Sequence, residues 1–125
     1  MRIAELARRT GTSPRSLRYY EEQGLLAPTR TPGGMREYGD DSVDHVILIQ
    51  YFLAAGLNSA TIATMMPCAC THRTTPAMVD ALLRRREVLD RRVRELTAMR
   101  DLADVLIMQA RERLDGVPAT VGRPE

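Results

Sequence analysis

The chain has 125 residues, which suffices for one small domain with an extension but not for a large enzyme scaffold with a deep cleft. Its formal net charge is only +2, and all 18 basic residues are Arg, so neither figure alone indicates a nucleic-acid partner. No apolar run approaches the roughly 20 residues that cross a bilayer, and no apolar signal block precedes the first amphipathic segment. We therefore expect a cytoplasmic protein that has no membrane partner and no disulfide framework.

The positions of the charged residues are more informative than the net charge of the chain. The first 18 residues contain a single acid, Glu5, against five arginines. These arginines are Arg2, Arg8, Arg9, Arg15 and Arg18. A basic face of this kind on a small unit is what a phosphate-binding surface requires.

Two short helices are predicted at the start of the chain. Residues 3–7 carry apolar side chains at i, i+3 and i+4, and Gly11 then suits a left-handed turn. Ser13 is a good N-cap, and Pro14 follows at the first helical position. Two helices joined this tightly, with Gly in the turn, form a helix-turn-helix.

The second of these helices has a polar outward face. Arg15, Ser16 and Tyr19 share that face, with Arg18 beside it, whereas Tyr20 can pack inward. Guanidinium, hydroxyl and phenol groups suit base edges and phosphate oxygens. The alternative is an ordinary solvated helix whose tyrosines belong to the core.

A small β-hairpin is predicted around Pro32-Gly33-Gly34, which is strong turn chemistry. Arg30 and Arg36 then lie on its two arms. A basic hairpin beside a helix-turn-helix is a wing that can hold the DNA backbone. The alternative is a plain surface loop.

Two core helices and a linker follow. The sequence 40–42 is expected to cap a strongly apolar third helix, which ends near Gly56. Asn58 or Ser59 is expected to cap a fourth helix over residues 60–66 that stops at Pro67. Residues 67–76 are then a linker between prolines.

Residues 77–114 read as one long helix without Gly or Pro, about 55 Å in length. Its apolar seam alternates spacings of three and four, with Arg86 and Arg100 at two a-type positions, where polar groups restrict register and orientation. The seam favours dimerisation, although a helix folded onto its own domain remains an alternative. Residues 115–125 are expected to be a flexible tail. The apolar seam residues are Val79, Leu82, Leu89, Val93, Leu96, Ala103, Ile107, Ala110 and Leu114.

Four stretches together resemble the MerR family of bacterial transcription regulators: IAELARRTG, SPRSLRYYEEQGLL, PTRTPGGMREY and FLAAGLN. The resemblance is close over residues 1–66 and general over residues 77–114. It implies a mainly α protein, in which a winged helix-turn-helix DNA-binding domain (1–66) precedes a dimerisation helix that forms an antiparallel coiled coil (77–114). It also implies a dimer on a pseudo-palindromic operator.

The same resemblance implies a mechanism. Such dimers bend and untwist the over-long spacer of a promoter so that RNA polymerase can engage. Carried onto this chain, Arg15 and Ser16 approach base edges. A further set of residues would hold the DNA backbone or in part pack the domain, namely Arg18, Tyr19, Tyr20, Arg36 and Tyr38.

The effector, if one exists, is left open. Cys68, Cys70 and His72 have the chemistry of a metal site or a redox switch, or the cysteines are structural or incidental. Metal sensors and iron–sulphur members of the family carry further ligands near the carboxyl end, and residues 116–125 contain no Cys or His. The fold itself requires no cofactor. Three methionines, which either pack the core or line a site for a small apolar effector, flank this segment: Met65, Met66 and Met78.

Competing classes of protein fit less well. An architectural or excisionase-like DNA binder without promoter activation would not need the seam, and an adaptor would not need the arginines of the second helix. No catalytic constellation is present, and His45 lies on an apolar helix, so we do not expect an enzyme.

Overall fold

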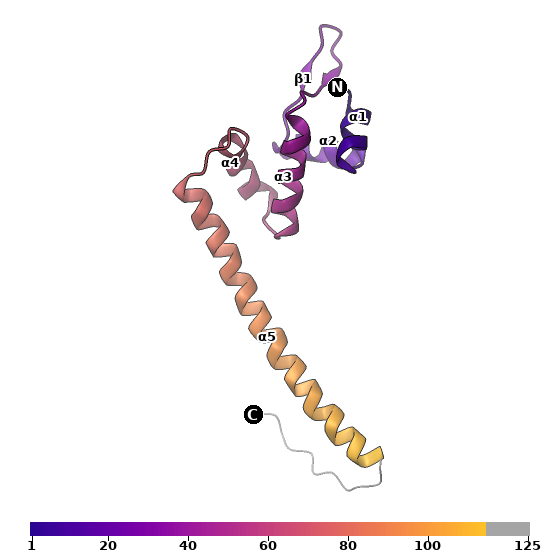
Figure 1. Cartoon of the computed structure of the whole chain (residues 1–125), viewed down its shortest axis with the longest axis vertical. Coiled ribbons are helices and arrows are strands. Elements are labelled where there is room, and N and C mark those ends of the chain that lie inside the picture. The colour runs from indigo at the N-terminus through magenta and orange to yellow at the C-terminus, as the bar shows by residue number, and fades with distance from the viewer. Residues whose placement is uncertain (115–125) are drawn as a thin grey trace. The chain divides into compact units, whose positions relative to one another are not determined.

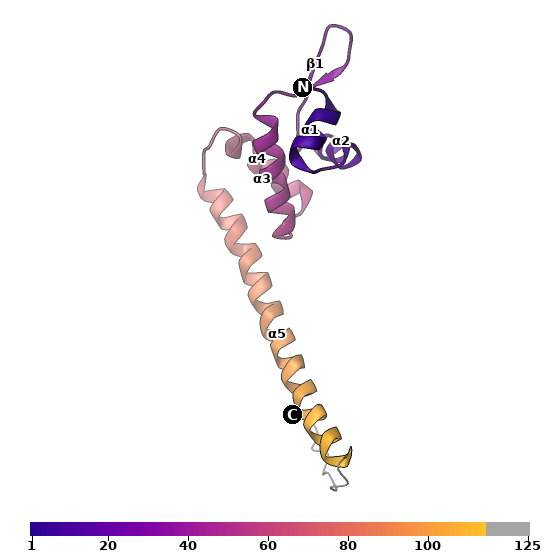
Figure 2. The same cartoon turned by 45° about the vertical axis from the view of Figure 1, so that its right-hand side comes forward.

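The computed structural model describes residues 1–114, which form five helices and a two-stranded sheet (Figures 1 and 2). By its internal contacts the chain divides into two units, residues 1–85 and the residues from 86 onward. None of the helices in the described part of the chain combines the length and apolar character that crossing a membrane demands.

The first two helices form the predicted helix-turn-helix. Helix α1 (Ile3–Thr10) continues three residues beyond the predicted range, and α2 (Pro14–Glu22) begins at the predicted proline. Gly11 between them has a φ of 68°, and the Ser13 hydroxyl accepts a hydrogen bond from the Ser16 N–H at 3.1 Å. Each helix contributes a fully buried leucine to the core, Leu6 from α1 and Leu17 from α2.

The predicted hairpin is present. Strand β1 (Thr29–Arg30) pairs antiparallel with β2 (Arg36–Glu37), and Arg30 lies opposite Arg36. The turn is closed by the Gly34 N–H, which donates to the Thr31 carbonyl at 2.8 Å, and Gly34 has a φ of 82°. The alternative of a plain loop is therefore excluded.

Helix α3 (Ser42–Ala54) supplies the centre of the core through Val46 and Ile49, both fully buried. The expected acidic cap is wrong in its geometry. Asp41 occupies the N-cap position, but its backbone is helical and its carboxylate caps no N–H. The carboxylate lies instead 3.9 Å from Nε2 of His45, one turn further along the helix.

Helix α4 (Ser59–Ala69) begins as predicted, because the Asn58 side chain accepts a hydrogen bond from the Thr61 N–H at 2.8 Å. Its predicted end at Pro67 is wrong. The proline is exposed on the solvent side, and buried packing of the preceding Met65 and Met66 holds the helix together past the missing N–H. Cys68 therefore lies in the last turn of α4 and Cys70 is its C-cap residue, rather than both lying in a linker.

Helix α5 (Pro76–Leu114) is uninterrupted over 39 residues and begins one residue earlier than predicted. Its first turns belong to the unit formed by residues 1–85: Met78 is buried in the core and Ala81 packs against it. Nε of Arg85 donates to the Ala55 carbonyl at the end of α3, with a distance of 2.9 Å. From Arg91 to Leu114, nearly every residue is exposed in the single chain.

Candidate nucleic-acid interface

Helix α2 turns a polar face to solvent. Arg15, Arg18 and Tyr19 are exposed, and Ser16 is half-buried beside the N-cap, where its hydroxyl accepts from the Ser13 hydroxyl at 3.0 Å. The Tyr19 ring is 47% exposed, which leaves its phenol available to a partner. Four of the predicted contacts thus lie on one accessible helix of a folded unit.

Two of the predicted contact residues are buried. Tyr20 belongs to the core, and the Tyr38 side chain is 1% exposed, with its hydroxyl donating to the Glu21 carboxylate. Burial raises the pKa of Tyr38, and the hydrogen bond to Glu21 raises it further. Sequence reasoning left open which tyrosines pack the domain, and burial assigns both of these rings to packing.

Glu21 joins the hairpin to α2. Its second carboxylate oxygen pairs with Nε of Arg36 at 2.9 Å, and the Glu21 side chain is only 11% exposed. Burial is the largest cause of the raised pKa of Tyr38, and Glu21 raises it further. The charges of Arg36 and Arg18 act in the opposite direction and lower this pKa. The structure therefore joins Arg36 of the hairpin and the Tyr38 hydroxyl to Glu21 of α2, a connection that sequence spacing did not reveal.

Not every arginine of the basic first segment is equally available. Arg8 and Arg9 both bind the Glu5 carboxylate, at 2.8 Å and 3.1 Å, and Arg8 is the main cause of the lowered pKa of Glu5. The i,i+3 and i,i+4 spacings in the sequence already allow these pairs. Their charge is partly neutralised within α1.

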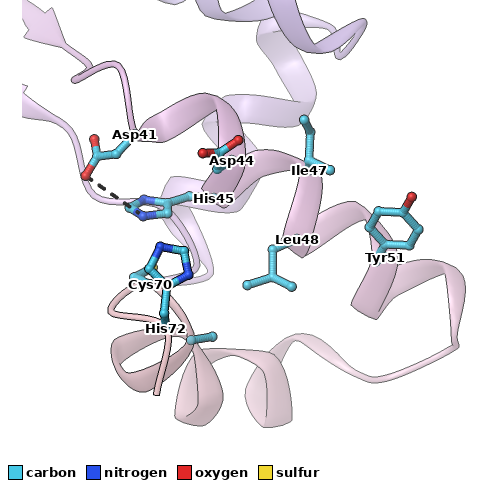
Figure 3. A pocket seen from close by; sticks show the side chains of 9 residues that line it. Asp41, Asp44, His45, Ile47, Leu48, Tyr51, Cys70 and His72 are labelled. Carbon is cyan, nitrogen blue, oxygen red and sulfur yellow. Dashed lines mark ion pairs between the residues drawn. The ribbon is translucent and has the colours of Figure 1, made fainter. Parts of the chain in front are cut away.

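The cysteine segment lines a cavity of about 330 Å³ between α3 and the end of α4 (Figure 3). In Figure 3 the side chains of His45, Cys70 and His72 lie close to one another, while Leu48 and Tyr51 follow further along α3. The cavity combines an apolar wall with several titratable groups. Its lining residues are Asp41, Asp44, His45, Ile47, Leu48, Tyr51, Ala69, Cys70 and His72.

The chemistry of this segment gives little support to a sensor. Cys68 and Cys70 are both free and half-buried. Burial raises the pKa of the Cys70 thiol, and the charge of Asp41 raises it further, so less of the reactive thiolate is present. Within residues 1–114, no group of three or more His, Cys, Asp or Glu side chains is arranged to hold a metal ion. The three methionines beside the segment, Met65, Met66 and Met78, are buried and pack the core.

The predicted seam residues of α5 are all exposed in the single chain, and the larger ones range from 37% for Leu89 to 84% for Leu114. Apolar residues off the predicted seam are exposed too, and they concentrate in the second half of the helix. These residues are apolar in the sequence but lie outside the a and d positions of the heptad repeat. These residues are Met99, Leu102, Val105, Leu106 and Met108. An apolar helix exposed over this length has the surface of an unpartnered coiled-coil strand.

Comparison with known proteins agrees with this geometry. Residues 1–68, more than half of the chain, match the family described as MerR HTH family regulatory proteins. The chain therefore belongs to the MerR family of helix-turn-helix transcription regulators, which bind DNA.

Individual relatives extend the similarity over α5. The chain is 34% identical to the nodulation protein NolA of Bradyrhizobium elkanii. The matched region covers 96% of this chain and 53% of NolA. It is 30% identical to the regulator CueR of Vibrio cholerae, over 80% of this chain and 73% of CueR. The chain thus spans about half the length of the NolA proteins that it matches.

A solved structure shares the fold of both units. The crystal structure of HiNmlR, described as a MerR family regulator that lacks the sensor domain and is bound to promoter DNA, covers 93% of this chain and 94% of its own. The TM-score is 0.60 and the sequence identity is 19%. A likeness at this identity concerns the fold alone.

Proposed function

We propose that this protein is a homodimeric regulator that binds a pseudo-palindromic operator and activates its promoter by distorting the spacer between the −35 and −10 elements. The observation that carries the proposal is the combination of an accessible α2 face with an α5 seam that is exposed over its whole length. Membership of the MerR family supports it, and so does the description of HiNmlR as bound to promoter DNA.

Helix α2 enters the major groove in this proposal. Arg15 and Ser16 near its N-terminus read base edges, as the first residues of a recognition helix commonly do. Arg18 and Tyr19 hold the phosphate backbone, joined by Arg36 from the hairpin. The ion pair between Arg36 and Glu21 fixes the hairpin against α2, so both elements approach DNA as one rigid body.

Two such bodies are needed to set the twist of DNA. Pairing of the α5 helices through Val79, Leu82, Leu89, Val93, Leu96, Ala103 and Ile107 places one α2 at each half-site. The dimer then bends and untwists the DNA between them. RNA polymerase can then engage the −35 and −10 elements despite the over-long spacer. The deformation energy of the spacer is supplied by contacts that two half-sites permit and one does not.

Footprinting on the DNA upstream of the protein's own gene, followed by transcription in vitro, tests this proposal. We expect protection of a palindrome between −35 and −10 elements with an over-long spacer, and activation that disappears when the spacer is shortened to the polymerase's preferred length. Binding to a palindrome without any effect on transcription would instead indicate an architectural protein.

The division of roles on α2 gives a first mutational prediction. Arg15→Ala should relax the preference among operator variants at one base position by about 10-fold, because a bidentate base contact is worth about 1–3 kcal/mol. Arg18→Ala should weaken binding to operator and scrambled duplex alike and lower the salt dependence. Fluorescence anisotropy on both duplexes measures both quantities. An unchanged operator preference in Arg15→Ala would remove this residue from the reading role.

A further inference from the structure

The cavity of about 330 Å³ between α3 and the end of α4 lies apart from the predicted DNA contacts, since no residue of α2 or of the hairpin lines it. Half-buried Leu48 and Ala69 give it an apolar wall, whereas the exposed Asp41 and Asp44 lie on its solvent side. Apolar surface beside a few polar groups is the usual composition of a site for a small organic molecule.

The permanently charged side chains of this cavity are acidic. Its lining contains the carboxylates of Asp41 and Asp44 and no Arg. Asp44 forms no ion pair with any of residues 1–114. The charge of Asp41 also acts inside the cavity: burial raises the pKa of the Cys70 thiol, and the Asp41 carboxylate raises it further. A positively charged ligand would therefore be attracted by this cavity.

His72 has a backbone conformation that glycine adopts more easily. Its φ is 58°, and it is the only non-glycine residue with a positive φ among residues 1–114. The His72 N–H donates to the Ala69 carbonyl at 3.1 Å, and the Arg73 N–H donates to the Cys68 carbonyl at 2.9 Å. This pair of bonds is a common ending of a helix, at which Gly is the preferred residue. A strained histidine in the lining of a cavity points to a use of its side chain.

The two histidines of the lining supply hydrogen-bonding groups. In Figure 3 the imidazole of His45 lies between the Asp41 carboxylate and the imidazole of His72. Because no group of three or more potential ligands within residues 1–114 is arranged to hold a metal ion, these imidazoles are better suited to an organic ligand. A primary ammonium has three N–H donors and can reach a carboxylate and an imidazole nitrogen together, whereas a quaternary ammonium has none.

We propose that this cavity binds a small primary amine with an apolar body of about one ring. Its ammonium group donates to Asp44 and to the imidazole of His72, and its apolar body packs against Leu48 and Ala69. The exposed Tyr51 ring lies at the other end of the lining, along α3. The site shares no residue with the surface that we assign to DNA, so the inference does not depend on the proposed function.

Calorimetric titrations of the full chain at neutral pH with four benzyl compounds test the choice of ligand. We expect benzylamine to bind at least about 10-fold more tightly than benzyl alcohol, because a hydrogen bond to a charged group is worth about 1.5–3 kcal/mol. Benzoate should bind more weakly than either. Benzyltrimethylammonium, which keeps the charge and has no donor, should also bind about 10-fold more weakly than benzylamine.

Three outcomes of these titrations would overturn the inference. Absence of benzylamine binding, or a preference for benzoate, would contradict a site for cations. Equal affinity for benzylamine and benzyltrimethylammonium would contradict recognition of a primary amine. Tight binding of zinc alone that His72→Gly abolishes would make the imidazoles metal ligands instead.

Two variants then locate the site. Asp44→Asn should remove the preference for benzylamine over benzyl alcohol. Asp40→Asn is the matched control and should keep this preference, because Asp40 is an exposed acid of the same segment outside the lining. His72→Gly should weaken benzylamine binding about fivefold, the loss expected for one hydrogen bond.

Thermal unfolding separates a binding role of His72 from a structural one. The midpoint of His72→Gly should equal or exceed that of the wild type, because Gly adopts a positive φ without strain. A lower midpoint would show that the His72 side chain serves the fold and would contradict its role in binding. Unchanged benzylamine affinity in both Asp44→Asn and His72→Gly would place the amine elsewhere and overturn the site.

Discussion

Glu21 lies on α2 and is in contact with two residues that follow the turn of the hairpin. Its carboxylate accepts a hydrogen bond from the Tyr38 hydroxyl and forms an ion pair with Arg36. A carboxylate that is this strongly buried needs both partners, because leaving a charged group with unmet hydrogen bonds is costly. One side chain thus decides whether the hairpin and α2 move together.

Tyr38→Phe should lower the free energy of unfolding by about 1–3 kcal/mol, because it removes the hydrogen bond to Glu21 and keeps the ring. The folded-state pKa of Tyr38 lies above the value of about 10 for an unfolded tyrosine, so its stabilisation is complete below that pH and is lost as the pH rises. The difference in stability between wild type and Tyr38→Phe should therefore shrink above about pH 10. Urea unfolding at neutral and alkaline pH measures this, with the exposed Tyr51→Phe as control.

Cys70 should be a slow nucleophile. Since burial and Asp41 raise the pKa of its thiol, its reaction with iodoacetamide at neutral pH should be slower in native protein than in urea. The midpoint of its rate–pH profile should also lie higher in the native state. Mass spectrometry of the alkylated peptide measures both rates. Faster alkylation of native Cys70 would revive the redox interpretation.

At the scale of elements, local chemistry predicted starts better than ends. Ser13 and Asn58 cap α2 and α4 as expected, because capping depends on a few adjacent residues. The end of α4 was mispredicted, since the helix passes Pro67 only by virtue of the buried Met65 and Met66. The packing of Tyr20 and Tyr38 was left open for the same reason: burial depends on residues far away in the sequence.

The contact between α3 and α5 depends on a glycine. Gly56 has a φ of 81°, and a Cβ at this position would come within 2.1 Å of the Arg85 guanidinium. The hydrogen bond from Arg85 to Ala55 needs this space. A positive φ and a close approach thus coincide at the point where α5 meets the end of α3.

Gly56→Ala should therefore destabilise the protein more than Gly24→Ala. Both positions have a positive φ, which costs Ala about 1–2 kcal/mol, but a Cβ at Gly24 meets no atom within 4 Å. In an Arg85→Ala background the two substitutions should become equivalent. Thermal unfolding of the five variants measures the differences. An equal cost of both glycine substitutions in the wild-type background would show that Arg85 adapts without loss.

At the scale of the whole molecule, the exposed α5 seam is the interface of the proposed dimer. Leu96→Glu places a charge on the seam and should convert the proposed dimer into a monomer, with operator affinity reduced at least about 100-fold because avidity is lost. Light scattering after size exclusion and anisotropy measure the two effects. Arg94→Glu, two residues away and off the seam, should leave the dimer intact. A monomeric wild type would contradict the dimer itself.

In the proposed dimer, two arginines of the uninterrupted α5 would favour one direction of the partner helix. Arg86 and Arg100 occupy equivalent positions two heptads apart on the seam. A parallel, in-register pair would stack each guanidinium on its own copy, whereas an antiparallel pair sets a-type positions against d-type ones and gives each Arg an apolar neighbour. In the proposed dimer, repulsion between like charges would therefore disfavour the parallel arrangement as much as apolar contacts favour the antiparallel one.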